Sequence, residues 1–99
     1  MATKIERSSG NVFRDLGFGT QEAENLRVRS ELMIQIRKLI EQRRLTQAGA
    51  AKVFGVTQPR VSDLVRGRID LFSIDTLVKM LAQAGVQVRL VVKRRRQVA

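Results

Sequence analysis

The residues best suited to recognition chemistry lie between Leu45 and Arg68, in the stretch LTQAGAAKVFGVTQPRVSDLVRGR. A helix that served stability alone would fill its solvent face with Glu, Lys and Ala. The second half of this stretch instead presents side chains that donate or accept hydrogen bonds. Such a face can recognise a ligand by its pattern of donors and acceptors. The positions expected to face outward are Gln58, Pro59, Arg60, Ser62, Asp63 and Arg66.

The charge of the chain favours a polyanionic ligand. The 99 residues contain 19 Lys plus Arg against 9 Asp plus Glu, which gives a net charge of +10 and a pI near 11.6. A field of this sign attracts nucleic acid, an acidic protein surface or an anionic membrane face. Residues 45–68 hold four basic side chains and one acidic side chain, and residues 89–99 hold five basic side chains and no acidic one. These two segments are therefore the candidate contact regions.

The composition argues against an enzyme. The sequence has no Cys and no His, which removes thiol nucleophiles, imidazole bases and nearly every zinc site. It also lacks a glycine-rich phosphate loop and paired carboxylates, so we expect no catalytic residue, no metal and no cofactor. The N-terminus has no apolar signal region, and no window approaches the roughly 18 apolar residues of a membrane span. These features predict a cytoplasmic protein without membrane contact.

Helix signals predict an all-α fold of five helices with one short C-terminal β-strand. Asn11 and Gly17 delimit a short helical turn. From Thr20, the expected N-cap, an apolar stripe runs to Arg43 and Arg44, as one long helix or as a short helix followed by a longer one. The remaining helices have capping and terminating residues in the pairs Thr46 and Gly55, Thr57 and Gly67, and Ser73 and Gly85.

The domain boundaries follow from these elements. Residues 1–10 are polar and are expected to form a flexible arm, and residues 11–92 form the domain. Within the domain, residues 86–92 switch to the period of two that is typical of a strand. Residues 93–99 are a basic tail, for which a disordered end is the first interpretation and a DNA-binding arm or partner-docking tail are alternatives.

The two short helices around Gly55 have the spacing of a helix–turn–helix, at residues 46–66. Ala50 and Ala51 are small, so the second helix can approach the first closely. Gly55 can adopt the positive φ that ends one helix and redirects the chain. The side chains expected to point into the core are Val56, Val61, Leu64 and Val65.

This stretch resembles the helix–turn–helix of the phage-repressor-like XRE regulators. Over residues 11–92, the chain is also similar to the branch that contains the HigA-type antitoxins. The resemblance implies a five-helix DNA-binding domain that acts as a dimer on a pseudo-palindromic operator. It implies base contacts from Gln58 and neighbouring contacts from Thr57, Pro59, Ser62 and Asp63. It further implies phosphate contacts from Thr46, Gln47, Arg60, Arg66 and Arg68.

The side chains agree with these roles, with two departures from the family pattern. Gln can match adenine in the major groove, and Arg is the usual partner of guanine. Gly49 should cost its helix about 0.5–1 kcal/mol relative to Ala, and Pro59 can offer only a van der Waals contact, for example to a thymine methyl. Asp63 either pairs with Arg60 or Arg66 along the helix, the favoured interpretation, or accepts from cytosine.

Two functions fit the sequence. The first is a sequence-specific DNA-binding transcriptional regulator, a repressor that acts on double-stranded DNA at the nucleoid. The alternative is the antitoxin of a type II toxin–antitoxin pair, which would neutralise a small basic RelE/HigB-like toxin and autoregulate its operon. In that case we expect the toxin to contact residues 1–19 through Phe13, Leu16 and Phe18.

The strand at 86–92 predicts a homodimer. A lone strand leaves its N–H and C=O groups unpaired, and antiparallel pairing with a second copy satisfies both ladders about a two-fold axis. Residues 3–7 are the internal alternative, and dimerisation through the helix at 74–84 is the alternative interface. The dimerising side chains are expected to be Val86, Val88, Leu90 and Val92.

Overall fold

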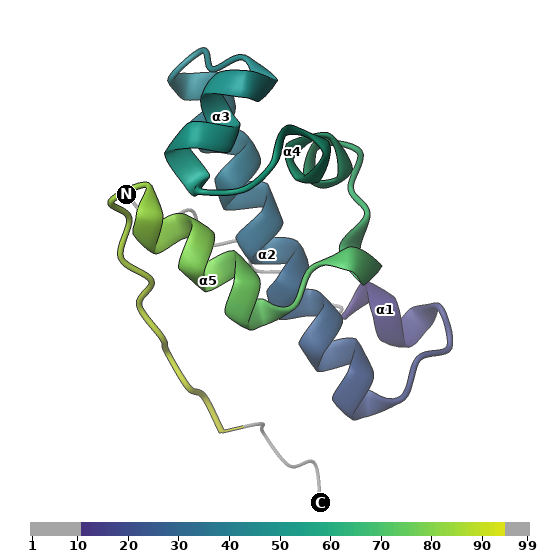
Figure 1. The fold of residues 1–99 in the computed structure, drawn as a ribbon. Coiled ribbons are helices and arrows are strands. Elements are labelled where there is room, and N and C mark those ends of the chain that lie inside the picture. The colour runs from purple at the N-terminus through teal and green to yellow at the C-terminus, as the bar shows by residue number, and fades with distance from the viewer. Residues whose placement is uncertain (1–10, 95–99) are drawn as a thin grey trace, which may run out of the picture.

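The computed structural model describes residues 11–94, which form five α-helices and one 3₁₀ turn (Figure 1). The expected arm at 1–10, the internal strand candidate at 3–7 and the last five residues of the basic tail fall wholly outside the described residues. The elements in chain order are α1 (Val12–Asp15), α2 (Thr20–Gln42), α3 (Gln47–Phe54), α4 (Gln58–Val65), the 3₁₀ turn η1 (Ile69–Leu71) and α5 (Ile74–Gln83).

Helices α1, α4 and α5 pack against the long helix α2, whereas α3 packs against α4 and α5 (Figure 1). The first half of α2 contacts α1, and α5 packs along it. Its second half lies behind α3 and α4. Helices α2, α3, α4 and α5 contribute apolar side chains to one core, and α1 contributes none. Burial of that core therefore holds α3, α4 and α5 in place. The buried core consists of Met33, Ile36, Ala50, Phe54, Val61, Leu64, Phe72, Leu77, Met80 and Leu81.

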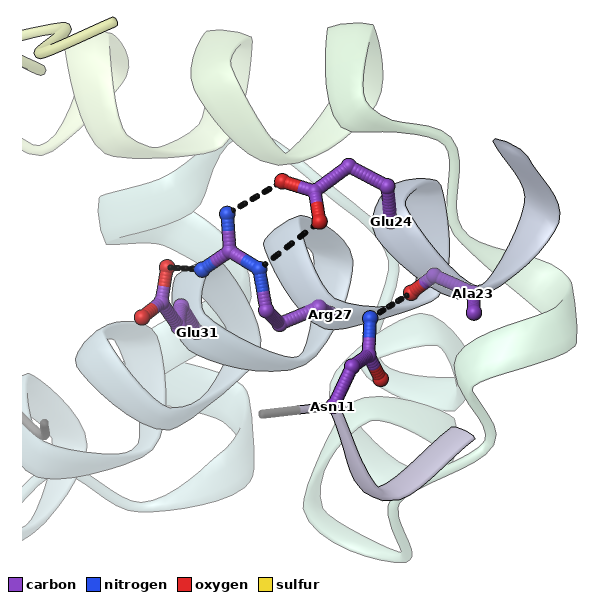
Figure 2. Close-up of polar contacts among 5 residues, drawn as sticks. All are labelled: Asn11, Ala23, Glu24, Arg27 and Glu31. Carbon is purple, nitrogen blue, oxygen red and sulfur yellow. Dashed lines mark hydrogen bonds and ion pairs between the residues drawn. The ribbon is translucent and has the colours of Figure 1, made fainter. Parts of the chain in front are cut away.

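The short helix α1 is held to α2 by Asn11, as Figure 2 shows. The Asn11 side chain accepts from the backbone N–H of Phe13 at 2.9 Å, which is the expected N-cap. Its Nδ2 also donates to the carbonyl of Ala23 at 2.7 Å. Behind the helix, the Phe13 and Phe18 rings meet edge to face with centroids 6.3 Å apart. One amide side chain therefore both begins α1 and docks it.

The solvent face of α2 near this contact carries an ion-pair network. Arg27 donates to Glu24 at 2.6 Å and to Glu31 at 3.0 Å, one turn to either side (Figure 2). The hydrogen bond to Glu24 is the main cause that raises the pKa of Arg27 above its ordinary value. Because all three side chains are about half exposed, the network contributes little to stability.

Residues 20–42 form one continuous helix, which decides between the two alternatives left open by the sequence. Its N-cap is Gly19, so the expectation that Thr20 caps this helix is wrong. Thr20 is the first helical residue because the extended backbone needed at the cap is adopted by Gly19. At the other end Arg43 is the C-cap, and Arg44 takes a left-handed φ of 52°.

The predicted strand at 86–92 is not present in the described part of the chain. The segment runs extended beside α5 without a ladder partner (Figure 1). Its beginning is fixed by packing, because Val86 and Val88 lie against the core. Leu90 and Val92 are 82% and 93% exposed. A strand needs a second strand to pair with, and a single copy of residues 11–94 supplies none.

Gly55 and Gly67 end α3 and α4 in the left-handed conformation, with φ of 68° and 76°. Their surroundings differ. A Cβ on Gly55 would lie 3.1 Å from Cγ of Gln83, whereas a Cβ on Gly67 would meet nothing within 4 Å. Substitutions at the two positions can therefore distinguish the cost of backbone strain, which both share, from the cost of a close side-chain contact, which only Gly55 has.

We expect Gly67→Ala to lower the free energy of unfolding by about 1–2 kcal/mol, the cost of a Cβ at left-handed φ. Gly55→Ala should cost more, because its Cβ also presses on Gln83. Urea denaturation of both variants, of Gln83→Ala and of the Gly55→Ala/Gln83→Ala pair measures the difference. In the double variant, the loss of stability caused by Gly55→Ala should fall to that of Gly67→Ala, because the side-chain atoms that the new Cβ presses on are absent. A Gly55→Ala protein as stable as the wild type would contradict the left-handed turn.

Candidate nucleic-acid interface

Local hydrogen bonds build the α3–turn–α4 unit. The Thr46 hydroxyl accepts from the Gly49 N–H at 3.0 Å and begins α3. After Gly55, the N–H of Val56 returns to the Ala51 carbonyl at 3.0 Å and closes the turn. Thr57 then begins α4 by accepting from the Arg60 N–H at 3.4 Å. The predicted caps and the predicted glycine are thus confirmed in this unit.

Helix α4 divides into a buried face and an outward face. Val61 and Leu64 are 1% and 0% exposed and belong to the same core as Phe54. Val65, which was expected in the core, is 37% exposed, so that expectation is wrong. The reason is helical geometry: Val61 and Leu64 centre the buried stripe, and Val65 lies about 100° further round than Leu64.

The outward face of α4 begins at its N-terminus. Positions 58, 59, 62, 63 and 66 are three or four residues apart and share one side of the helix. Of the expected site residues, Thr57, Gln58, Pro59, Arg66 and Arg68 are exposed, and Ser62 and Asp63 are half-buried. Thr46 and Gln47 are exposed at the beginning of α3. The structure therefore gives both helix beginnings a solvent-accessible polar surface.

Arg60 departs from the expected outward position. Its guanidinium carbon lies 4.4 Å from the centroid of the Phe72 ring. Its Nη1 donates to the carbonyl of Leu71 at 3.1 Å. The Arg60 side chain therefore points towards the turn that follows α4, and the residue is half-buried.

Asp63 lacks the partner that the sequence favoured. Neither Arg60 nor Arg66 forms an ion pair with it in the described part of the chain. Arg60 is engaged with Phe72 and the Leu71 carbonyl, and Arg66 is the C-cap residue of α4. The carboxylate is thus left half-buried on the outward face, without a cation to neutralise it.

Sequence reasoning missed Arg29 and Phe72. Arg29 donates from α2 to the carbonyls of Ile69 at 3.2 Å and Phe72 at 3.4 Å. The side chain of Asn25 orients it by accepting from its Nε at 2.7 Å. These contacts join residues 40 and 43 positions apart, so no local pattern signals them.

Other kinds of site find no support among residues 11–94. No group of three or more Asp and Glu side chains there is placed to hold a metal ion. None of the described helices is long and apolar enough to cross a membrane. The polar face of the α3–α4 unit is therefore the candidate functional site.

Comparisons with known proteins agree with this geometry. A helix–turn–helix domain family matches residues 12–93. A solved chain described as an XRE-family transcriptional regulator has 30% sequence identity and a TM-score of 0.71, over 79% of this chain and 91% of that chain. No curated protein matches the sequence. The likeness to HigA-type antitoxins receives no support from these matches. The chain belongs to the helix–turn–helix domain family.

Proposed function

We propose that the protein is a sequence-specific DNA-binding transcriptional regulator, a repressor that reads its operator with α4. The observation that carries this proposal is the outward face of α4, where exposed polar residues lie opposite the buried Val61 and Leu64. The net charge of +10 and the similarity to an XRE-family regulator support it. A protein with this function works on the nucleoid, in the cytoplasm.

The dimensions of α4 suit the major groove. An α-helix with its side chains is about 10–12 Å in diameter, and the groove is about 12 Å wide. Gln58 stands in the first turn, where its amide can pair with adenine N7 and N6. Pro59 beside it offers an apolar contact to a thymine methyl. One turn later, Asp63 can accept only from a base amino group such as cytosine N4.

The phosphate contacts come from residues around this face. Thr46 and Gln47 lie at the beginning of α3, where unpaired backbone N–H groups and the helix dipole favour a phosphate. Arg66 and Arg68 are exposed beyond the other end of α4. These contacts set the register of the protein on the duplex, whereas the base contacts set its sequence preference. Thr57 and Ser62 add hydroxyl groups close to the same face.

We expect Gln58→Ala to weaken operator binding by about 1–3 kcal/mol and to relax the preference at one base pair. Arg66→Ala or Arg68→Ala should instead weaken operator and random DNA about equally and reduce the salt slope by about one. Selection of bound duplexes from a random pool, followed by titrations at several salt concentrations, measures both effects. An unchanged sequence preference in Gln58→Ala would show that α4 does not read DNA in this orientation.

We further propose that the repressor is a homodimer joined through residues 86–92. Val86 and Val88 anchor the segment on its own core, and the exposed Leu90 and Val92 continue the same alternation. A second copy, antiparallel across a two-fold axis, would pair the free backbone groups and cover these side chains. Two copies of α4 about 34–36 Å apart could then read two half-sites of a pseudo-palindrome. Contact through α5 is the competing arrangement.

The Leu90→Ser/Val92→Ser variant should shift the protein from dimer to monomer at micromolar concentration, because it removes the shared apolar contact. Both side chains are exposed in a single copy, so the helical content should not change. Val91→Ser is the matched control: Val91 is 78% exposed but lies on the opposite side of an extended segment. Sedimentation equilibrium distinguishes the states. A double variant that stays dimeric would exclude this interface and favour α5.

The antitoxin function is a second proposal, and the exposed apolar side of α1 supports it. Val12 and Leu16 are 50% and 70% exposed, and Phe18 is 42% exposed. Solvent-exposed apolar side chains that cluster in this way are typical of a partner contact. A toxin of the RelE/HigB-like kind would be neutralised there, while α4 remains free to autoregulate the operon.

If α1 binds a toxin, Val12→Ser/Leu16→Ser should abolish co-purification with the product of the adjacent gene. DNA binding should be unchanged, because both residues lie on α1 and not on the α3–α4 unit. The pull-down is done with the full chain, with Gln58→Ala as the variant that affects DNA alone. Full recovery of the partner with the α1 variant would rule out this surface.

A further inference from the structure

Two carbonyl groups in the turn that follows α4, those of Leu71 and Phe72, accept hydrogen bonds from side chains. Outside the helices, no backbone N–H of residues 11–94 donates to the carbonyls of Leu71 or Phe72. The donors are guanidinium groups: Arg60 donates to the Leu71 carbonyl in a contact exposed to solvent, and Arg29 donates to the Phe72 and Ile69 carbonyls in part-buried contacts. The Ile69 carbonyl also accepts from the Phe72 N–H at 3.4 Å. A carbonyl that loses its donor is costly where it is shielded from water, so the Arg29 contacts are the more costly to lose.

The two arginines approach this turn from different helices. Arg60 comes from α4, and its guanidinium carbon lies 4.4 Å from the Phe72 ring centroid. Phe72 is 1% exposed and belongs to the core, so it is a fixed point for the stacked guanidinium. Arg29 comes from α2, with its Nε held by Asn25. The turn is thereby clamped between the helix that supports the domain and the helix proposed to read DNA.

We infer that Arg60 is a positioning residue, which together with Arg29 fixes the orientation of α4, and that it is not a phosphate contact. This inference rests on the proposed function of α4. A phosphate contact would require Arg60 to leave both the Phe72 ring and the Leu71 carbonyl, and the carbonyl would lose its donor. The N-terminal end of α4 is fixed by the Gly55 turn, and the clamp joins Arg60, in the first turn of α4, to the turn that follows the helix.

A lysine substitution can distinguish a positioning residue from a phosphate contact, because lysine can replace arginine only in the phosphate contact. A lysine can serve a phosphate as a point charge, but it lacks the planar fork that stacks on a ring while it donates to a carbonyl. Base contacts are short and directional, so a tilted α4 loses them first. The attraction to phosphates is long-ranged and survives a small tilt.

We expect Arg60→Lys to lower operator affinity about tenfold, from the lost stacking and charge-assisted hydrogen bond. Its affinity for random duplex and its salt slope should stay at the wild-type values. Arg29→Lys should give the same signature although Arg29 lies on α2. Arg37→Lys is the matched control, because Arg37 is exposed on α2 and has no role in the proposed contacts, and it should keep both affinities. Circular dichroism confirms that each variant is folded, and charge is conserved in all three.

One combination of results would contradict the positioning role of Arg60. If Arg60→Lys keeps full operator affinity and Arg60→Ala reduces the salt slope by about one, Arg60 is a phosphate contact and the inference is wrong. A measurement without DNA can show whether the inference about Arg60 fails, independently of whether the proposed DNA-binding function fails. Amide hydrogen exchange at residues 68–72 should accelerate in Arg60→Lys and Arg29→Lys but not in Arg37→Lys. A wild-type protein that selects no duplex would refute the DNA-binding proposal, while the exchange rates would still decide whether the clamp exists.

Discussion

Burial of Val61 and Leu64 is the interaction on which the α3–α4 unit depends. A helix of eight residues is not stable in water by itself, so α4 exists because these two side chains enter the core. Because this burial stabilises the helix, the residues on the opposite face do not need high helix propensity. Asp63 is a poor helix former in the middle of α4, and a residue there can be chosen for recognition. The outward face of α4 is polar because the inward face holds the helix.

The two ends of α4 are fixed by different kinds of contact. At the N-terminal end, a left-handed glycine and a capping threonine act within a few residues of one another. At the other end, the carbonyls of the turn at 69–72 are held by guanidinium groups from α2 and α4. A short helix held at both ends can present side chains at a defined angle. An error of about 1 Å in such a site is enough to lose directional hydrogen bonds.

This division explains what the sequence could predict. The helices, the caps Thr46, Thr57 and Ser73, and the core positions Val61 and Leu64 follow from local chemistry, and the structure has them. The Arg29 and Phe72 contacts were missed because they join residues about 40 positions apart, which no periodicity records. The strand at 86–92 was expected from its alternation. Alternation shows that one side of a segment is apolar, but pairing requires a second strand, which residues 11–94 of a single copy do not provide. Thr20 was misassigned because Gly19 can also adopt the extended backbone of a cap.

The unpaired Asp63 has a consequence for the proposed recognition. With Arg60 held by the Phe72 ring, no described cation neutralises this carboxylate, and it lies on the face that would meet the strongly anionic duplex. A carboxylate there lowers affinity for DNA in general, because it repels phosphate and cannot donate to the acceptors of purine edges. It favours only a duplex that places an amino group opposite it. A chain with net charge +10 is already attracted to any DNA sequence. In the proposed recognition, one carboxylate that repels most sequences would increase the discrimination between operator and other DNA more than another arginine could. The Phe72 ring and the Leu71 carbonyl that hold Arg60 keep it from pairing with Asp63, so the carboxylate stays available for the proposed base contact.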